Sequence, residues 1–363
     1  MKYLKYIILF LIFIASIIFM NTNEELYKDS IMKVENVEVY NIEKQKLDNL
    51  TEEYYYEMVT GKIINGSFKK KEVSFENISS YSGVYDDKYT KGDEVFVNLS
   101  IDGKITEVIN LRKDKYLVPL FVFMVCLLIA IGGIKGFYTF ISLIINIIII
   151  YLVTYFRDKG ISIFYLIIPA SILMSSISLL LTSGYNKKTK VSIISSISSL
   201  FITFIISYII IKIFNRNIPY WYMDYVDILY DYEEVFLVSV LISGLGAIMD
   251  IAISLTSTIN ELISNSPKIS IKALKKSGIN LSEDIMGTMI NVLLFTGVSG
   301  TIPMLIFVMR NNLGVITAIN MYAKIELIRF MTGCIGILVT IPITMYFAIF
   351  IFKGREKWYY WYI

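Results

Sequence analysis

The apolar segment GLGAIMDIAISLTSTINEL at residues 244–262 carries two carboxylates, Asp250 in its interior and Glu261 near its end. An aspartate within hydrocarbon costs about 2.5–3.5 kcal/mol, so Asp250 requires a partner, a bound proton or cation, or contact with water. At about 100° per residue, Ser254 and Ser257 fall on the helical face that carries Asp250. The sequence therefore predicts a proton-binding or cation-binding site on this face.

The same face also has a plainer interpretation, because membrane helices bury small and polar residues against one another. Gly244 and Gly246 precede the aspartate and would allow a second helix backbone to approach closely. For the glycines and serines, a packing seam is therefore the alternative to an ion site. Asp250 fits such a seam less well, because a charge needs more than a close neighbour.

A second polar face lies in SEDIMGTMINVLLFTG, residues 282–297, where Asp284 and Asn291 share one side of a helix and Gly287 lies beside them. Asp284 is either a further site ligand or a charge near a helix N-terminus, where the helix dipole stabilises it. Asn291 suits an interhelical hydrogen bond. We expect this face to meet that of Asp250 in the inner half of the bilayer.

The third group of functional candidates lies in KIELIRFMTGCIG, residues 324–336. Glu326 and Arg329 are three residues apart, so they can pair on one helical face near the outer interface. Local neutralisation of charge and a gating or binding role are both open interpretations. Gly333, one turn further on, is a predicted position of close helix packing.

The elements that position these residues follow from composition. The chain has 363 residues, of which 55% are hydrophobic, and its mean hydropathy is +0.61. Such a chain is predicted to be an all-α polytopic membrane protein with about eight transmembrane helices and a small extracytoplasmic β-rich domain between the first and second. The predicted organisation is an N-terminal signal anchor at 1–20, a β-rich domain at 21–115, a seven-helix bundle at 116–352 and a cytoplasmic tail at 353–363.

The β-rich region is recognised by short runs of strand-forming residues between glycine, asparagine and aspartate turns. EMVTGKIING (residues 57–66) and EVFVNLSIDG (residues 94–103) are examples. The pattern favours a small barrel or sandwich. A soluble module of this kind could bind an envelope or membrane protein partner through residues 21–115.

Charge predicts the orientation. Lysines cluster beside alternate apolar runs, as in KALKKSG at residues 272–278, and loops on the cytoplasmic side carry such an excess. We therefore expect both termini in the cytoplasm of a bacterial cell and the β-rich domain outside the plasma membrane.

Several kinds of chemistry are disfavoured. The chain has no histidine and only two cysteines, Cys126 and Cys334, both in apolar runs, so we expect no metal site and no cofactor. No glycine-rich phosphate loop is recognisable, so no ATP-binding motif is expected. The net charge of +3 argues against nucleic acid as a partner. Asp250 and Asp284 could share a proton as a catalytic dyad, but no supporting motif surrounds them, and we do not expect an enzyme.

Three segments together resemble the YibE/F family of bacterial multi-spanning membrane proteins. They are GLGAIMDIAISLTSTINEL (residues 244–262), GINLSEDIMGTMINVLLFTGVSG (residues 278–300) and ELIRFMTGCIGILVTIPIT (residues 326–344). RKDKYL at residues 112–117 and SGYNKKTK at 183–190 are also similar to that family. The chain departs from the family pattern at Leu281 and Ser282, where a glycine is usual, and in TGVSG at residues 296–300, where an alanine-tyrosine pair is usual. The resemblance implies that the following residues belong to the family pattern: Gly244, Gly246, Asp250, Glu261, Gly278, Asp284, Gly287, Asn291, Arg329, Gly333 and Pro342.

The resemblance implies an architecture and no assigned biochemical activity. The residues favour an ion-coupled transporter or permease, because that function accounts for Asp250. The alternative is a non-catalytic assembly or sensing protein whose extracytoplasmic domain binds a partner. That alternative accounts better for the β-rich domain.

Overall fold

The computed structural model describes residues 2–47, 50–81, 86–214, 231–310 and 314–354. Nearly all of the tail predicted at 353–363 lies outside these residues. Two compact units make up the chain, Met1–Gly133 and Ile134–Ile363.

The first unit contains a five-stranded antiparallel sheet in the order β3-β2-β1-β4-β5. The outer strands β3 and β5 also come into contact, so the sheet curls towards closure. This order resembles that of the five-stranded, partly open Greek-key barrels called OB folds. The strands are β1 (Ser30–Leu47), β2 (Leu50–Ile63), β3 (Glu72–Ser80), β4 (Glu94–Leu99) and β5 (Ile105–Leu111).

Alternating side chains fill the interior of the barrel, as the period of a strand requires. Val59 is fully buried, and its neighbours Met58 and Thr60 on the opposite face are partly exposed. Gly61 lies beneath β1, where an added Cβ would stand 2.2 Å from the carbonyl oxygen of Lys33. The buried core consists of Met32, Val34, Val59, Ile63, Val73, Tyr89, Val95 and Val97.

Two helices adjoin the barrel within the first unit. The first is α1 (Lys2–Met20), and the second is the N-terminal part of α2 (Asp114–Asp158). They pack through Phe13 and Phe123, whose ring centroids are 5.1 Å apart. α2 departs from helical geometry at Gly133, where φ is 61° and ψ is −134°. That conformation is rarely open to other residues, so the glycine permits the break.

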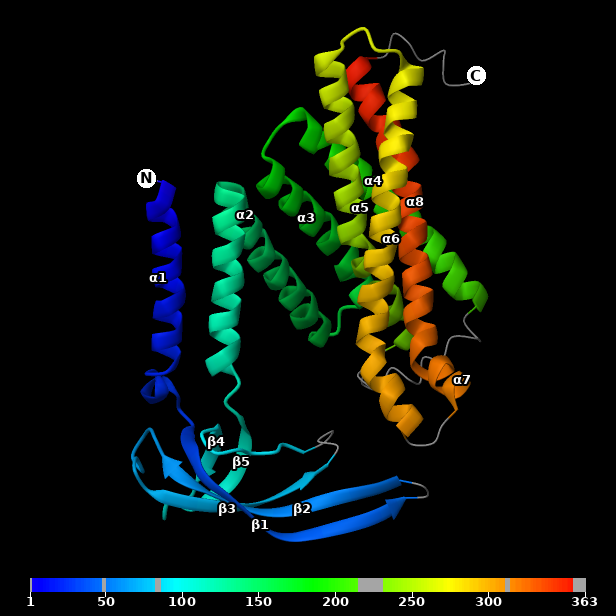
Figure 1. Cartoon of the computed structure of the whole chain (residues 1–363). Helices are drawn as coiled ribbons and strands as arrows, with labels where there is room; N and C mark the ends of the chain where they lie inside the picture. The colour runs from blue at the N-terminus through cyan, green and yellow to red at the C-terminus, as the bar shows by residue number, and fades with distance from the viewer. Residues whose placement is uncertain (1, 48–49, 82–85, 215–230, 311–313, 355–363) are drawn as a thin grey trace. The chain divides into compact units, whose positions relative to one another are not determined.

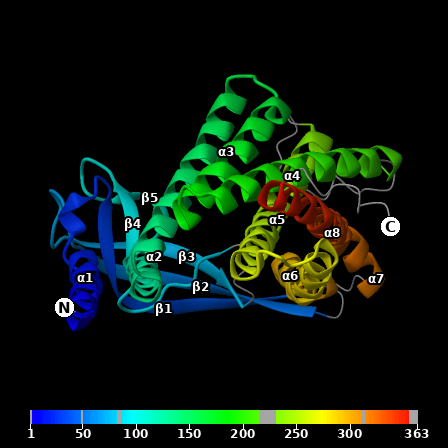
Figure 2. The ribbon, with the colours of Figure 1, turned by 90° about the horizontal axis from the view of Figure 1, so that it is seen from above.

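The second unit is a helical bundle in which α5 contacts α3, α4, α6 and α8 (Figures 1 and 2). Besides the remainder of α2, its elements are α3 (Ile163–Ser183), α4 (Lys187–Phe214), α5 (Tyr232–Asn265), α6 (Ile271–Arg310), α7 (Val315–Ala318), the π-helix η4 (Ile319–Ala323) and α8 (Lys324–Lys353). By length and composition, six helices among the described residues could cross a membrane. Apolar runs near the length of a bilayer explain why the sequence forms them.

Small residues lie where α5, α8 and α4 contact one another. An added Cβ on Gly244 of α5 would stand 3.9 Å from the Cα of Gly333 in α8. At Gly336, one further turn along α8, an added Cβ would meet Thr203 of α4 at 3.0 Å. Three helices therefore meet at small residues, as is typical of helix association in membranes.

Candidate functional site

A cavity of about 730 Å³ lies between α5, α6, η4 and α8. Its wall is largely apolar, but Ser243 of α5 and Glu326 and Arg329 of α8 contribute polar groups to it. Small-molecule sites have this character: a volume of about 300–1,000 Å³ and a few convergent polar groups on an apolar wall. The remaining lining residues are Leu293, Thr296, Gly297, Gly300, Thr301, Met304, Met321, Tyr322, Ile325 and Phe330.

Glu326 and Arg329 form the ion pair that their spacing predicts, with only 20% and 19% of their side chains exposed. Arg329 also donates from Nε to the hydroxyl of Ser239 in α5, at 3.2 Å. Its guanidinium carbon lies 5.9 Å from the centre of the Phe236 ring. The arginine is thereby fixed between α5 and α8, with the carboxylate beside it.

The backbone next to this pair is irregular. The π-helix η4 ends at Ala323, directly before α8 begins. It supplies Met321 and Tyr322 to the cavity wall. Single π-turns are rare and are often found at functional sites. On the facing helix, Gly297 approaches the pair: an added Cβ there would lie 3.7 Å from Glu326 Oε2.

Asp250 does not line this cavity. It lies two helical turns further along α5 from Ser243, on the same face, and its side chain is exposed. Among the residues that the structure describes, Asp250 makes no hydrogen bond or ion pair. Ser254 and Ser257, on the same face, are partly exposed.

The polar residues of α6 are also exposed. Asp284 and Asn291 point away from the bundle core, and neither is hydrogen bonded to another described side chain. The structure thus places the polar faces of α5 and α6 on the surface of the chain, where we expected them to be in contact. Helical periodicity identifies the residues of a face, but it does not identify what covers that face.

The predicted packing glycines divide into two pairs. Gly244 and Gly333 pack closely against each other, as expected. Gly246 and Gly287 do not, because an added Cβ at either would meet no atom of the described chain within 4 Å. Both lie on the exposed face of their helix, which is why no neighbour reaches them.

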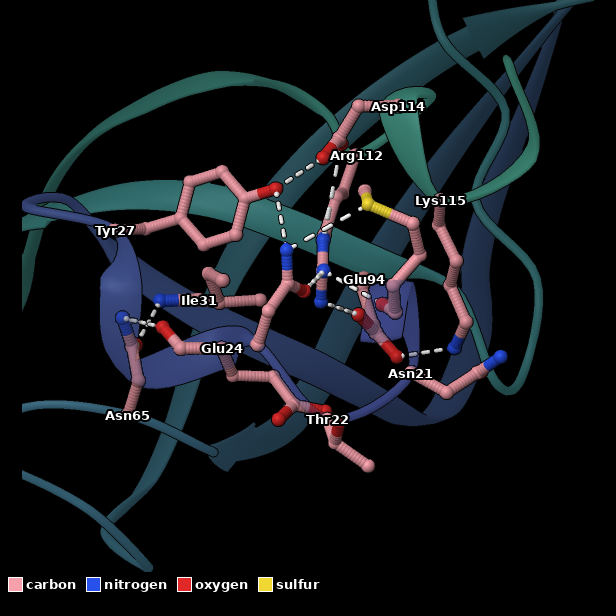
Figure 3. Close-up of polar contacts among 12 residues, drawn as sticks. Asn21, Thr22, Glu24, Tyr27, Ile31, Asn65, Glu94, Arg112, Asp114 and Lys115 are labelled. Atoms are coloured by element: carbon pink, nitrogen blue, oxygen red, sulfur yellow. Dashed lines mark hydrogen bonds and ion pairs between the residues drawn. The ribbon is translucent and has the colours of Figure 1, made fainter. Parts of the chain in front are cut away.

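A second polar cluster lies in the first unit, where the barrel joins its helices (Figure 3). Arg112 follows β5 and its side chain is fully buried. It pairs with Glu94 of β4, the Nη1–Oε2 distance being 2.5 Å, and donates from Nη2 to the carbonyl oxygen of Met20 at 2.9 Å and to Asn23 Oδ1 at 2.5 Å. Lys115 donates to the other oxygen of Glu94 at 2.5 Å.

The surroundings shift the pKa values of two members of this cluster, Arg112 and Tyr27. Burial of the Arg112 guanidinium lowers its pKa, but the adjacent Glu94 carboxylate and the Tyr27 hydroxyl together raise it more, so the pKa of Arg112 lies above its ordinary value. Tyr27 donates to Asp114 at the start of α2, and its ring lies 4.9 Å from the guanidinium carbon. Burial, followed by that hydrogen bond, raises the pKa of Tyr27. The cluster ties the end of α1, strand β4 and the start of α2 together.

Sequence reasoning missed the Arg112 cluster and most of the cavity wall. RKDKYL is similar to a family pattern, and the sequence analysis predicts no ion pair there. The usable signal was an arginine directly between a strand and an apolar helix, a place where burial requires a carboxylate partner. No comparable signal marks Gly297 or Tyr322, because lining a cavity depends on packing.

Comparison with known proteins agrees with this architecture. The family model described as YibE/F-like protein matches residues 120–354. The model described as YibE/F family N-terminal domain matches residues 25–111. Searches of curated proteins and of solved structures give no match. The two family models cover the barrel and the helical bundle in turn, and the chain belongs to the YibE/F family.

Proposed function

We propose that the protein is an ion-coupled permease of the bacterial plasma membrane, and that the cavity between α5, α6, η4 and α8 is its solute site. The observation that carries the proposal is the Glu326–Arg329 pair in the wall of that cavity. Charged residues within membrane helices are costly, and they commonly mark solute or ion pathways. No catalytic residue is assigned.

The pair also indicates the chemistry of the solute. A guanidinium binds carboxylates and phosphates through paired N–H groups, and the neighbouring carboxylate binds a cationic group. A small zwitterion can therefore displace the internal Glu326–Arg329 contact, with its anionic group bound to Arg329 and its cationic group bound to Glu326. We propose a zwitterionic solute of this kind.

Asp250 is the proposed coupling group. Ser243 lines the cavity, and Asp250 is seven residues further along the same face of α5, about 10 Å along the helix axis. Water that reaches the cavity could extend along this face to the carboxylate. Protonation or cation binding at Asp250 would remove the cost of its charge in the bilayer. Ser254, Asp284 and Asn291 are proposed as supporting polar groups.

The proposed topology has eight crossings, with α1 as the anchor and with the two parts of α2 on either side of Gly133 crossing separately. Both termini are then cytoplasmic and the barrel is outside the cell. The lysine-rich connectors support this orientation.

The test is ion flux into proteoliposomes that contain the purified full chain. A membrane potential is imposed, and proton entry is followed with a trapped pH dye and sodium entry with a radioactive tracer. Asp250→Asn should reduce the flux at least tenfold, whereas Glu283→Gln, an exposed carboxylate near the start of the α6 polar face, should leave it unchanged. Wild-type flux equal to that of empty vesicles in both assays contradicts the proposal.

The solute is tested separately by thermal unfolding with a panel of small zwitterions. A true solute should raise the unfolding temperature of the wild type, and this shift should be lost in both Glu326→Gln and Arg329→Gln. Solutes that stabilise all three proteins equally bind elsewhere. If no zwitterion stabilises the wild type, the assignment of the solute class is wrong.

A second candidate, an assembly or sensing protein, is favoured by one observation: the Arg112 cluster fixes the barrel to α1 and α2. Barrels with this strand order bind extended ligands on the face of their second and third strands. Here that face carries Tyr56 beside Ile78. A photoreactive residue at Ile78 should capture a discrete envelope partner, and one at Leu26, which is 72% exposed and precedes β1, should not.

A further inference from the structure

The exposed faces of α5 and α6 combine two features that membrane helices normally bury. One is a set of polar side chains, Asp250 and Asn291, placed near the middle of their helices. The other is a pair of glycines, Gly246 and Gly287, with open space where a Cβ would be. Hydrocarbon satisfies neither feature, because it offers no hydrogen bond and no close backbone contact.

The most apolar segments of α1 and α2 can offer no side-chain hydrogen bond to this surface. Residues 7–15 of α1 and residues 117–129 of α2 contain no side chain with a nitrogen or oxygen atom. The hydroxyl and amide donors in the middle of α2 are used within the bundle: Ser178 accepts a hydrogen bond from Ser142 at 2.9 Å and another from Asn146 at 3.0 Å. A cover for Asp250 must supply a donor that these segments lack.

The surface itself carries complementary groups. Asp250 is an acceptor when ionised, and Asn291 carries an amide that can donate to it. A surface with both groups can meet a copy of itself, because in a twofold dimer each contact occurs twice with the roles exchanged. The two glycines allow the close backbone approach that such a contact requires.

We propose that this surface is the contact between two copies of the chain, in which Asp250 of one protomer accepts a hydrogen bond from Asn291 of the partner subunit. The surface is defined by Gly246, Asp250, Gly287 and Asn291. Two Asp250 carboxylates are then brought to one interface near the bilayer centre. The dimer does not depend on transport, because the argument rests on burial alone.

The first test counts protomers. The full chain, placed in lipid nanodiscs at low protein-to-disc ratio, is weighed by native mass spectrometry. Two copies of the 41.7 kDa chain per disc are expected. Single chains at every protein concentration would overturn the proposal.

The second test locates the contact. In a background with Cys126→Ala and Cys334→Ala, Gly246→Cys or Gly287→Cys is treated in native membranes with a short bifunctional thiol reagent. A product of twice the chain mass is expected. Phe201→Cys is the control, because this residue of α4 is 61% exposed and lies on a different helix. A product of another mass, or equal dimer from the control, would overturn the assignment.

A third variant separates assembly from folding. Gly246→Leu fills the space at the contact and should lower the dimer fraction at least tenfold, while Phe201→Leu should not alter it. Circular dichroism confirms that both variants fold. A folded Gly246→Leu protein that remains fully dimeric places the interface elsewhere and overturns the proposal.

Discussion

The guanidinium of Arg112 and the carboxylate of Glu94 are 2.5 Å apart, and their side chains are 0% and 4% exposed. Removing one member of such a buried pair leaves a charge with no adequate partner, which typically costs about 3–5 kcal/mol. Glu94→Leu should therefore lower the free energy of unfolding by about that amount. Thermal and denaturant unfolding of the full chain in one detergent measures the change.

The control is an exposed pair in the same barrel, Lys62–Glu35, at 2.9 Å. Because water screens exposed charges, Glu35→Leu should cost far less than Glu94→Leu. Equal losses for the two variants would show that burial does not strengthen the Arg112 contact.

Gly61 permits the close pairing of β1 and β2. A Cβ on this residue would stand 2.2 Å from the backbone oxygen of Lys33, which cannot move without disturbing the strand pairing. Gly61→Ala should destabilise the barrel by about 1–3 kcal/mol, as overpacking typically does. Hydrogen exchange of the peptides from residues 30–63 should become roughly ten- to a hundredfold faster.

Thr60→Ala provides the comparison for Gly61, since Thr60 points to the outer face of the same strand. Exchange in this variant should match the wild type. If Gly61→Ala exchanged no faster than Thr60→Ala, β1 and β2 would be further apart than the structure shows.

Gly133 is expected to be far less replaceable than its neighbour Gly132. At Gly133, φ is 61° and ψ is −134°, a conformation that costs other residues about 1–3 kcal/mol. Gly132 has an ordinary φ and open space around it. Gly133→Ala should lower the unfolding temperature, whereas Gly132→Ala should leave it unchanged or raise it slightly. Similar unfolding temperatures for both variants would mean that α2 has no break at Gly133.

The buried phenol of Tyr89 should make the free energy of unfolding fall at high pH. Burial raises the pKa of this phenol to about 12, above its ordinary value of 10.0. The unfolded chain therefore releases the proton first, so stability is retained below about pH 10 and falls as pH rises towards 12. The loss should be about 1–3 kcal/mol. Denaturant unfolding of the wild type and of Tyr89→Phe at each pH measures this loss of the free energy of unfolding. The loss should be smaller in Tyr89→Phe by about 1–3 kcal/mol. An identical pH profile for the two proteins would contradict the raised pKa of Tyr89.

Much of the architecture could be predicted from patterns that extend over neighbouring residues. Apolar runs indicated the helices, and three-residue spacing indicated the Glu326–Arg329 pair, because both depend on local geometry. The pairing of Arg112 with Glu94 could not be predicted this way. It joins residues 18 positions apart and arises from the register of β4 and β5, which alternation alone does not specify.

The polar face of α5 shows a different limit. Periodicity correctly grouped Asp250 with Gly246 and Ser254, but two faces of similar composition need not meet within one chain. The structure turns Gly244 towards α8 and leaves Gly246, two residues away, on the surface. That choice depends on how tightly the helices around α5 pack, and sequence spacing carries no record of it.

The Arg112 cluster has a mechanical consequence. One side chain is anchored to the last turn of α1 through Met20, to β4 through Glu94 and, at 3.7 Å from Nε, to Asp114 in the first turn of α2. These three contacts restrict rotation of the barrel relative to the end of α1 and the start of α2. A torque applied to the barrel is therefore transmitted to the adjoining ends of α1 and α2 together.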